Sequence, residues 1–193
     1  MAKLYFKYGV MGSSKSAQAL MCKYNYEQKN YKVLLIKPAT DNRNDSKNNT
    51  FVRSGIGLKA PCFAFPLNLN LYNYIVDQIQ MHGYNVVIVD EAQFCTAKQI
   101  EELKEISRQI PVLCYGLKNN FKSLLFEGSK RLIEIADSLT EIKSVCACGR
   151  KADANARYIN GKIVTDGQEV VIGGNEMYES MCYNCWLDKQ KKQ

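Results

Sequence analysis

The chain has 193 residues, a length that suits one domain or a domain with a small second unit. Its formal net charge is +7 and its sequence pI is near 8.9, values that suit a protein binding anionic nucleotides or nucleic acid. No apolar run is long enough to cross a bilayer, and no segment has the pattern of a secretory leader. We therefore expect a soluble, cytoplasmic protein that does not contact membranes and whose cysteines stay reduced.

The loop after the first expected strand is the strongest functional signal. Alternating apolar residues predict a strand at 4–8, and a helix is expected over 15–28. The loop resembles the phosphate-binding pattern G-x-x-x-x-G-K-[ST], with Ser14 in place of the second glycine. Its residues are Gly9, Val10, Met11, Gly12, Ser13, Ser14, Lys15 and Ser16.

Such a strand, loop and helix direct backbone N–H groups and the helix N-terminus toward one anion. Lys15 would then reach the β- and γ-phosphates of a nucleotide, and the Ser16 hydroxyl would bind Mg²⁺. The alternative is an ordinary strand–helix turn with a solvated lysine. A serine at position 14 would cost about 1–2 kcal/mol if that position requires a positive φ.

The next elements continue an alternation of strands and helices. An apolar strand is expected at 33–36, closed by Pro38. The segment from 40 to 50 is rich in Asp, Asn, Lys and Ser, which predicts a polar loop. Residues 71–81 then have helical spacing.

Two adjacent carboxylates end the following strand. The run Val86–Val89 has no polar alternation, as expected for a strand buried on both faces of a parallel sheet. Asp90 and Glu91 come directly after it. A carboxylate at this end of a strand is where nucleotide-binding sheets hold Mg²⁺, directly or through water. The alternative is a helix N-cap with an acidic first turn.

The rest of the first domain repeats the alternation. We expect a helix that begins near Thr96, a strand at 110–116 and a helix within 125–136. Strands that alternate with helices predict an α/β fold with a doubly wound, mostly parallel sheet. We assign this domain to residues 1–142.

Four of the eight cysteines form two close pairs near the end of the chain. They are Cys146, Cys148, Cys182 and Cys185. The second pair has the usual C-x₂-C spacing of a zinc site, and the first pair is one residue shorter. Four protein ligands leave no open position, which predicts a structural Zn²⁺. The alternative is two unrelated dithiols.

The residues between the two pairs predict a small second unit over 143–193. Asn160-Gly161 lies between two apolar segments and predicts a β-hairpin. The unit is too small to bury a core alone, so a metal clip would fix its shape.

Taken together, these motifs resemble a known family. They are Gly9–Ser16, Val89–Phe94, Cys114–Leu117, the cysteine pairs and Val171–Tyr178. The combination is similar to the thymidine kinases of the P-loop, zinc-binding class, the bacterial type that resembles the cytosolic thymidine kinase family. The resemblance implies that the α/β domain is a P-loop (RecA-like) core, joined to a zinc-anchored lasso that closes over the nucleoside. The resemblance implies transfer of the γ-phosphoryl group of ATP to the 5′-hydroxyl of thymidine, with deoxyuridine as a further acceptor, in nucleotide salvage.

The resemblance also assigns roles near the phosphates. Glu91 matches the catalytic acid of the family, which as a carboxylate takes the hydroxyl proton. Asp90 is then the carboxylate on the Mg²⁺ side. Asp41 and Arg43 match a family Asp-x-Arg near the phosphates, although a solvated loop pair is the alternative.

The resemblance implies a thymine pocket built from two groups of residues. Apolar side chains would come from Met11, Phe94, Leu117, Phe121 and Phe126. Backbone groups and one aromatic ring would come from Val170, Val171, Ile172, Gly173 and Tyr178. For Phe121 and Phe126, ordinary core packing is the alternative. A homotetramer and feedback by dTTP are further implications of the family.

Two other functional classes remain open at this point. A zinc-containing P-loop ATPase acting on nucleic acid would suit the basic charge, although no aromatic and basic stripe for stacking a strand is visible. A non-catalytic zinc-binding interaction module would leave Asp90, Glu91 and the phosphate loop unexplained. We expect nucleotide and thymidine as ligands and no nucleic acid.

Overall fold

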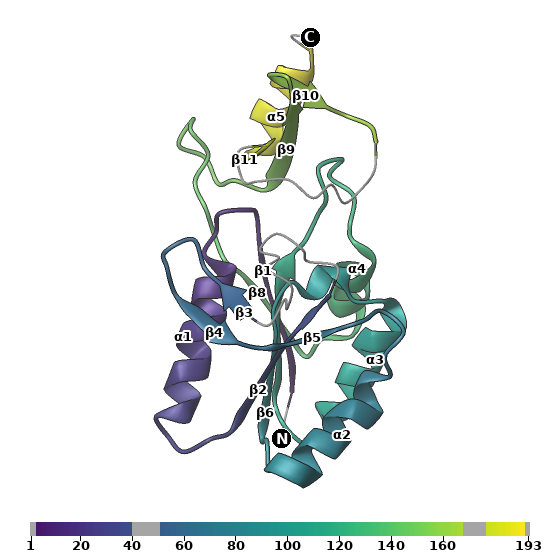
Figure 1. The fold of residues 1–193 in the computed structure, drawn as a ribbon. Helices are drawn as coiled ribbons and strands as arrows, with labels where there is room; N and C mark the ends of the chain where they lie inside the picture. Colours follow the sequence, from purple (N-terminus) through teal and green to yellow (C-terminus); the bar gives the residue numbers. More distant parts are fainter. Residues whose placement is uncertain (1–2, 40–50, 168–176, 192–193) are drawn as a thin grey trace.

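A parallel β-sheet forms the centre of the larger part of the molecule (Figure 1). The structure is a computed structural model that describes residues 3–39, 51–167 and 177–191. The sheet has six strands in the order β5-β2-β6-β7-β1-β8, and each neighbouring pair is parallel. Its strands are β1 (Leu4–Gly9), β2 (Val33–Pro38), β5 (Phe63–Phe65), β6 (Val86–Val89), β7 (Val112–Leu117) and β8 (Ser138–Glu141). The predicted α/β fold with a parallel sheet is confirmed.

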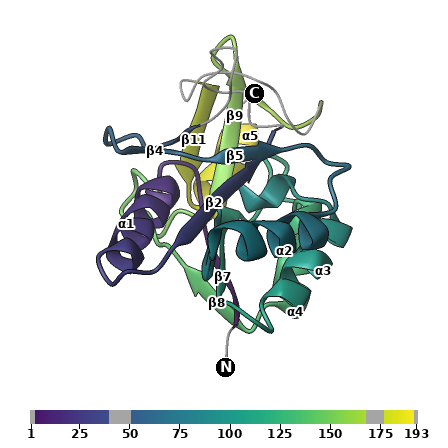
Figure 2. The same cartoon turned by 60° about the horizontal axis from the view of Figure 1, so that its bottom comes forward.

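Helices cover both faces of this sheet (Figures 1 and 2). Helix α1 lies on one face, and α2, α3 and α4 lie together on the other. Their bounds are α1 (Lys15–Glu27), α2 (Leu71–His82), α3 (Ala97–Ile106) and α4 (Glu127–Ile135). The helix expected to begin near Thr96 is confirmed as α3, and the Thr96 side chain accepts from the backbone N–H of Gln99 in a capping box at its start. Within the described ranges, none of the helices combines the length and the apolar character needed to span a bilayer.

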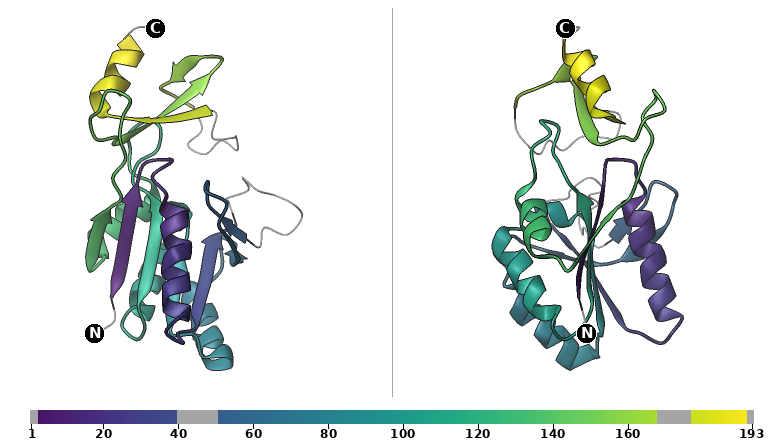
Figure 3. Two further views of the ribbon diagram at one scale, coloured as in Figure 1. Left: turned by 90° about the vertical axis from the view of Figure 1, so that its left-hand side faces the viewer. Right: turned by 180° about the vertical axis from the view of Figure 1, so that it is seen from behind.

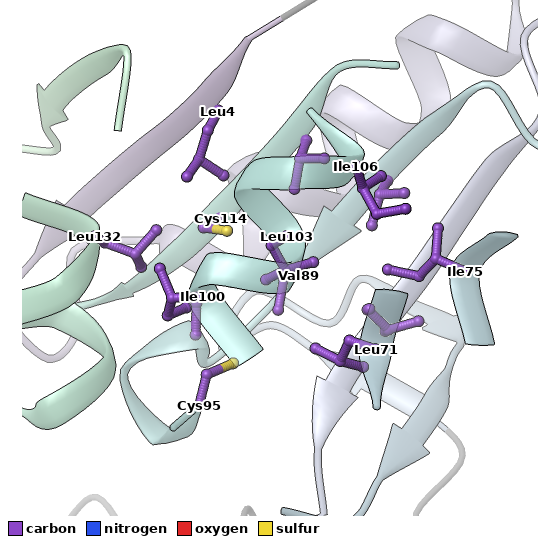
Figure 4. Packing of buried hydrophobic residues seen from close by; sticks show 14 of the residues in the cluster. Leu4, Leu71, Ile75, Val89, Cys95, Ile100, Leu103, Ile106, Cys114 and Leu132 are labelled. Carbon is purple, nitrogen blue, oxygen red and sulfur yellow. The ribbon is translucent and has the colours of Figure 1, made fainter. Parts of the chain in front are cut away.

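The sheet is apolar on both sides because its inner strands alternate between two cores. Val87 and Val89 of β6 face the cluster under α2, α3 and α4, whereas Val86 and Ile88 face the cluster under α1. Figure 4 shows the first cluster, in which the helices contribute residues that pack against the strands. Helix and strand residues labelled there are Leu71, Ile75, Ile100, Leu103, Ile106, Leu132, Leu4, Val89 and Cys114.

Several short elements were not predicted from the sequence. They are β3 (Phe51–Arg53), β4 (Lys59–Pro61), β5, β8 and the single 3₁₀ turn η1 (Ala92–Phe94). Each has three or four residues, too few for the periodicity of a strand or helix to be recognised. Strand β2 ends at Pro38, as expected, and Pro38 itself pairs with Phe65 of β5.

A smaller antiparallel unit follows the main sheet and sits above its carboxyl edge (Figure 3). Its strand order is β10-β9-β11, with bounds β9 (Ala154–Ile159), β10 (Lys162–Val164) and β11 (Tyr178–Met181). Helix α5 (Tyr183–Lys191) packs on it through the buried Trp186. The predicted hairpin is confirmed, because β9 and β10 are joined through Asn160 and Gly161, both at positive φ.

We predict that Gly128→Ala destabilises the fold. A Cβ at residue 128 would lie 2.5 Å from the Ala92 carbonyl oxygen and 2.7 Å from that of Cys95, so α4 or η1 must move. The expected loss is about 1–3 kcal/mol in the free energy of unfolding, measured by urea denaturation. Gly55→Ala is the matched control, because a Cβ there has no atom within 4 Å. Equal stabilities of the two variants would contradict this account of the α4 packing.

Candidate functional site

The loop after β1 folds tightly back on itself. A Cβ at Gly9 would lie 2.4 Å from the Ser13 hydroxyl oxygen and 2.6 Å from the Ile142 carbonyl oxygen, so only glycine permits this path. The Lys15 ammonium donates to the Val10 carbonyl at 2.7 Å, and its residue is only 8% exposed. The lysine is therefore held against the same loop whose backbone would bind the anion.

The positive φ anticipated for residue 14 is present. Ser14 lies in the left-handed region at φ 64° and ψ 24°, and Gly12 has φ 73°. The Ser14 side chain makes no capping hydrogen bond to α1, whose N-cap position it occupies. The serine therefore carries the steric cost of this conformation without the hydrogen bond that usually favours serine at a helix start.

The two acidic residues follow β6 directly, at the same edge of the sheet. Strand β7 lies between β6 and β1, with Val89 beside Cys114 and Gly9 beside Leu117, so the three strand ends are neighbours. Asp90 and Glu91 are both buried. Glu91 also has a positive φ of 52°, an uncommon conformation for a residue other than glycine.

Gln93 connects Glu91 to the end of β7. Its Nε2 donates to the Glu91 carboxylate at 2.6 Å, and its Oε1 accepts from the Leu117 amide at 3.0 Å. Gly116 leaves room for this contact, because a Cβ there would lie 2.7 Å from Gln93 Oε1. The carboxylate is thus oriented by an amide that is itself anchored to the sheet.

Apolar and aromatic residues gather beside these strand ends. The rings of Phe94 and Phe126 meet edge to face, with centroids 5.6 Å apart. Phe121 is buried, and the Arg157 guanidinium from β9 lies 3.8 Å from its ring centroid. Leu117 ends β7 and is also buried. The rings come from η1 and from the segment between β7 and α4, and the arginine comes from the C-terminal unit.

Two groups of expected site residues lie outside the described ranges. They are Asp41 and Arg43 near the phosphates, and Val170, Val171, Ile172 and Gly173 near the base. Tyr178 is described, half-buried at the start of β11, where it pairs with Arg157 of β9.

The four clustered cysteines meet at one point of the C-terminal unit. Their Sγ atoms all lie within 4.8 Å of one another, and the Cys148 and Cys182 sulfurs are 3.6 Å apart. Thiolates at about 2.3 Å around a tetrahedral zinc would be about 3.8 Å apart, so the set fits that ion. The short C-x-C spacing therefore does not keep Cys146 out of the cluster. All eight cysteines carry thiols, without disulfides.

The electrostatics of this cluster suit a cation. Backbone N–H groups, that of Cys148 first, lower the pKa of Cys146 to about 6. Hydrogen bonding to the other cysteines, Cys182 first, raises the pKa of Cys185 to about 12. Crowded thiols cannot all ionise together, and a bound Zn²⁺ would remove that restriction by stabilising four thiolates.

Comparison with known proteins identifies the family. The model of the family described as thymidine kinase matches residues 2–186. The chain belongs to the thymidine kinase family. The chain is 42% identical over 192 residues to a thymidine kinase of Zymomonas mobilis, covering 98% of both proteins. It is 44% identical over 186 residues to one of Legionella pneumophila strain Lens, covering 94% of this chain and 88% of that protein. Membership of the family establishes thymidine kinase activity, an ATP-dependent phosphotransfer.

Three residues at this site, Gln93, Asn155 and Arg157, were not predicted from the sequence. Gln93 stood within a motif that carried the resemblance, and its spacing from Glu91 could have marked it as a partner. Asn155 and Arg157 stand in a strand of the C-terminal unit, where nothing in the sequence signals a contact with the main domain. Only the folded arrangement brings them to the phosphate loop and to Phe121.

We predict that Ser14→Gly both stabilises the chain and strengthens ATP binding. Glycine adopts positive φ without a steric penalty, which offsets its larger entropy loss on folding. We expect a gain of up to about 1 kcal/mol in the free energy of unfolding, with a lower Kd for ATP by calorimetry. Ser14→Ala is the control, because it removes only the hydroxyl. A gain in the alanine variant as large as in the glycine variant would contradict backbone strain.

A second prediction concerns the metal. We expect one zinc per chain in the purified protein by elemental analysis, and a large loss of zinc in Cys146→Ser because a thiolate ligand is replaced by a poorly coordinating hydroxyl. Cys62→Ser is the control, since Cys62 lies outside the cluster. Full zinc content in Cys146→Ser would show that the ion is held without this ligand.

Proposed function

We propose that Glu91 is the catalytic base of the thymidine kinase reaction and that the loop 9–16 binds ATP. The main support for this proposal is that the loop after β1 and the acidic pair after β6 lie at the same edge of the parallel sheet. The Glu91 carboxylate accepts the proton of the thymidine 5′-hydroxyl as that oxygen attacks the γ-phosphorus of ATP. Gln93 holds the carboxylate in position through its bond to the Leu117 amide.

The phosphate side of the proposal uses the loop and the second carboxylate. Backbone N–H groups of Gly9–Ser16 and the N-terminus of α1 hold the phosphates, and Lys15 stabilises the charge of the transferring group. Ser16 and Asp90 hold Mg²⁺, which neutralises phosphate charge when bound. Asp41 and Arg43 complete the phosphate contacts in this proposal.

The nucleoside side uses both units of the chain. In this proposal the thymine ring is surrounded by the side chains of Met11, Phe94, Leu117, Phe121 and Phe126. The backbone of residues 170–173 binds the polar edge of the base, and Tyr178 lies against the nucleoside. Apolar rings supply contact area, and backbone groups discriminate donors from acceptors. A pocket of this kind also accepts deoxyuridine.

We further propose a division of the chain into a nucleotide-binding domain, 1–142, and a zinc-anchored lasso domain, 143–193. The fit of the four sulfurs to a tetrahedral ion supports structural Zn²⁺. Reduced cysteines support a cytoplasmic location. We also propose that the protein forms a homotetramer and is inhibited by dTTP. Only its membership of the family supports these two proposals.

An assay of ADP release distinguishes a thymidine kinase from a zinc-containing P-loop ATPase that acts on nucleic acid. Release should depend on thymidine and should not respond to single-stranded DNA or RNA. Family membership favours this outcome. Release that requires a nucleic acid strand would support the other function instead.

We predict that Glu91→Gln lowers kcat by about 10²–10⁴ while ATP still binds, because the amide cannot accept the proton but keeps the shape of the side chain. Steady-state kinetics and ATP calorimetry measure the two quantities. Glu105→Gln is the control, since Glu105 lies on α3 and pairs with Arg108. Unchanged turnover in Glu91→Gln would remove Glu91 from the role of base.

A further inference from the structure

The phosphate loop is packed against the C-terminal unit as well as the sheet. Val10 belongs to the apolar core of that unit, together with Ala154, Ala156 and Met181. The next residue, Met11, donates its backbone N–H to Asn155 Oδ1 at 2.8 Å. The loop therefore has an apolar and a polar attachment to β9, a strand more than 140 residues away in the sequence.

The same asparagine reaches a second loop. Its Nδ2 donates to the Asn119 carbonyl oxygen at 3.0 Å. Asn119 opens the segment that carries Phe121 and pairs with Leu125 across it. One buried amide, 3% exposed, thus joins the loop after β1 to the loop after β7.

The chemistry of this position selects an amide. Asparagine offers an acceptor and a donor on one planar group, and the two bonds use one of each. Aspartate would bring a carboxylate toward the Asn119 carbonyl, and leucine would satisfy neither partner. Each of these partly buried groups, left without its bond, would carry part of the cost of its desolvation.

The backbone that carries Asn155 is also fixed in place. Asn155 pairs with Ser180 of β11, and the adjacent pair joins Ala154 to Met181. Cys182, a member of the four-sulfur cluster, follows Met181 directly. The cluster and the antiparallel sheet therefore hold the amide at a fixed position within the C-terminal unit.

We propose that Asn155 is a positioning residue that holds the phosphate loop and the 119–125 loop in one arrangement, so that a single residue sets the affinities for both substrates. The proposal rests on the proposed function, in which these loops bind ATP and the thymine ring. Asn155 acts through Met11 and Asn119, and it takes no part in proton transfer.

The test compares zinc-loaded wild-type protein with Asn155→Leu, which keeps a similar volume and loses both bonds. We expect the Kd for ATP and the KM for thymidine each to rise about tenfold, the equivalent of losing one partly buried hydrogen bond, while kcat at saturation changes little. A purely structural defect would lower the active fraction and kcat without raising both constants. Unchanged constants in a folded, zinc-loaded Asn155→Leu protein would overturn the proposal.

Tyr158→Phe is the matched control. Tyr158 lies on the same strand, and its hydroxyl bonds to Glu179 and Lys189 stay within the C-terminal unit. We expect this variant to keep wild-type values of both substrate constants. A rise in both constants here would show that any weakening of β9 has the same effect, and the specific role of Asn155 would be lost.

The hydrogen bond between Met11 and Asn155 can also be tested in the wild-type protein, so this test does not depend on whether a variant folds. The Met11 amide should exchange slowly with solvent by NMR, because Asn155 holds it, and rapid exchange would overturn the proposal. This readout is independent of catalysis. If the wild-type protein did not bind ATP, the proposed function would be wrong. The exchange rate of the Met11 amide would still show whether the Asn155 contact forms.

Discussion

The tight path of the chain around Gly9 is the constraint on which the rest of the structure depends. The Ser13 hydroxyl and the Ile142 carbonyl occupy the space that a side chain at residue 9 would need. Ile142 also donates its N–H to the Tyr8 carbonyl at 2.6 Å. The chain therefore leaves the main sheet for the C-terminal unit in contact with the phosphate loop, and neither can shift without displacing the other.

Two of the unfavourable backbone conformations lie where the proposed chemistry takes place. Ser14 and Glu91 both have positive φ, one at the start of α1 and one at the start of η1. Such conformations persist only when the surrounding packing fixes them. Here β1 and β6 are held inside a parallel sheet with apolar cores on both faces, which can sustain the cost of two strained turns at its edge.

The sequence predicts those parts whose cause is local or periodic. The apolar run at β6 indicates a buried strand, Thr96 starts α3 as its chemistry requires, and the cysteine pairs meet despite their uneven spacing. The contacts of Asn155 could not be predicted, because a single amide in a strand gives no sign of which distant loop it meets. Strand β3 and edge strand β8 were missed because three or four residues of mixed polarity carry no period.

The core of the C-terminal unit explains why its metal would matter beyond the unit. Among the described residues, that core has nine buried residues, and Cys146 and Cys182 are two of them. A core of this size does not offset the entropy of ordering its chain, so ligand bonds to an ion would supply part of its stability. Because Val10 is buried in the same core, loosening the unit would also expose one side of the phosphate loop. The proposed zinc would thus support nucleotide binding while taking no part in the reaction.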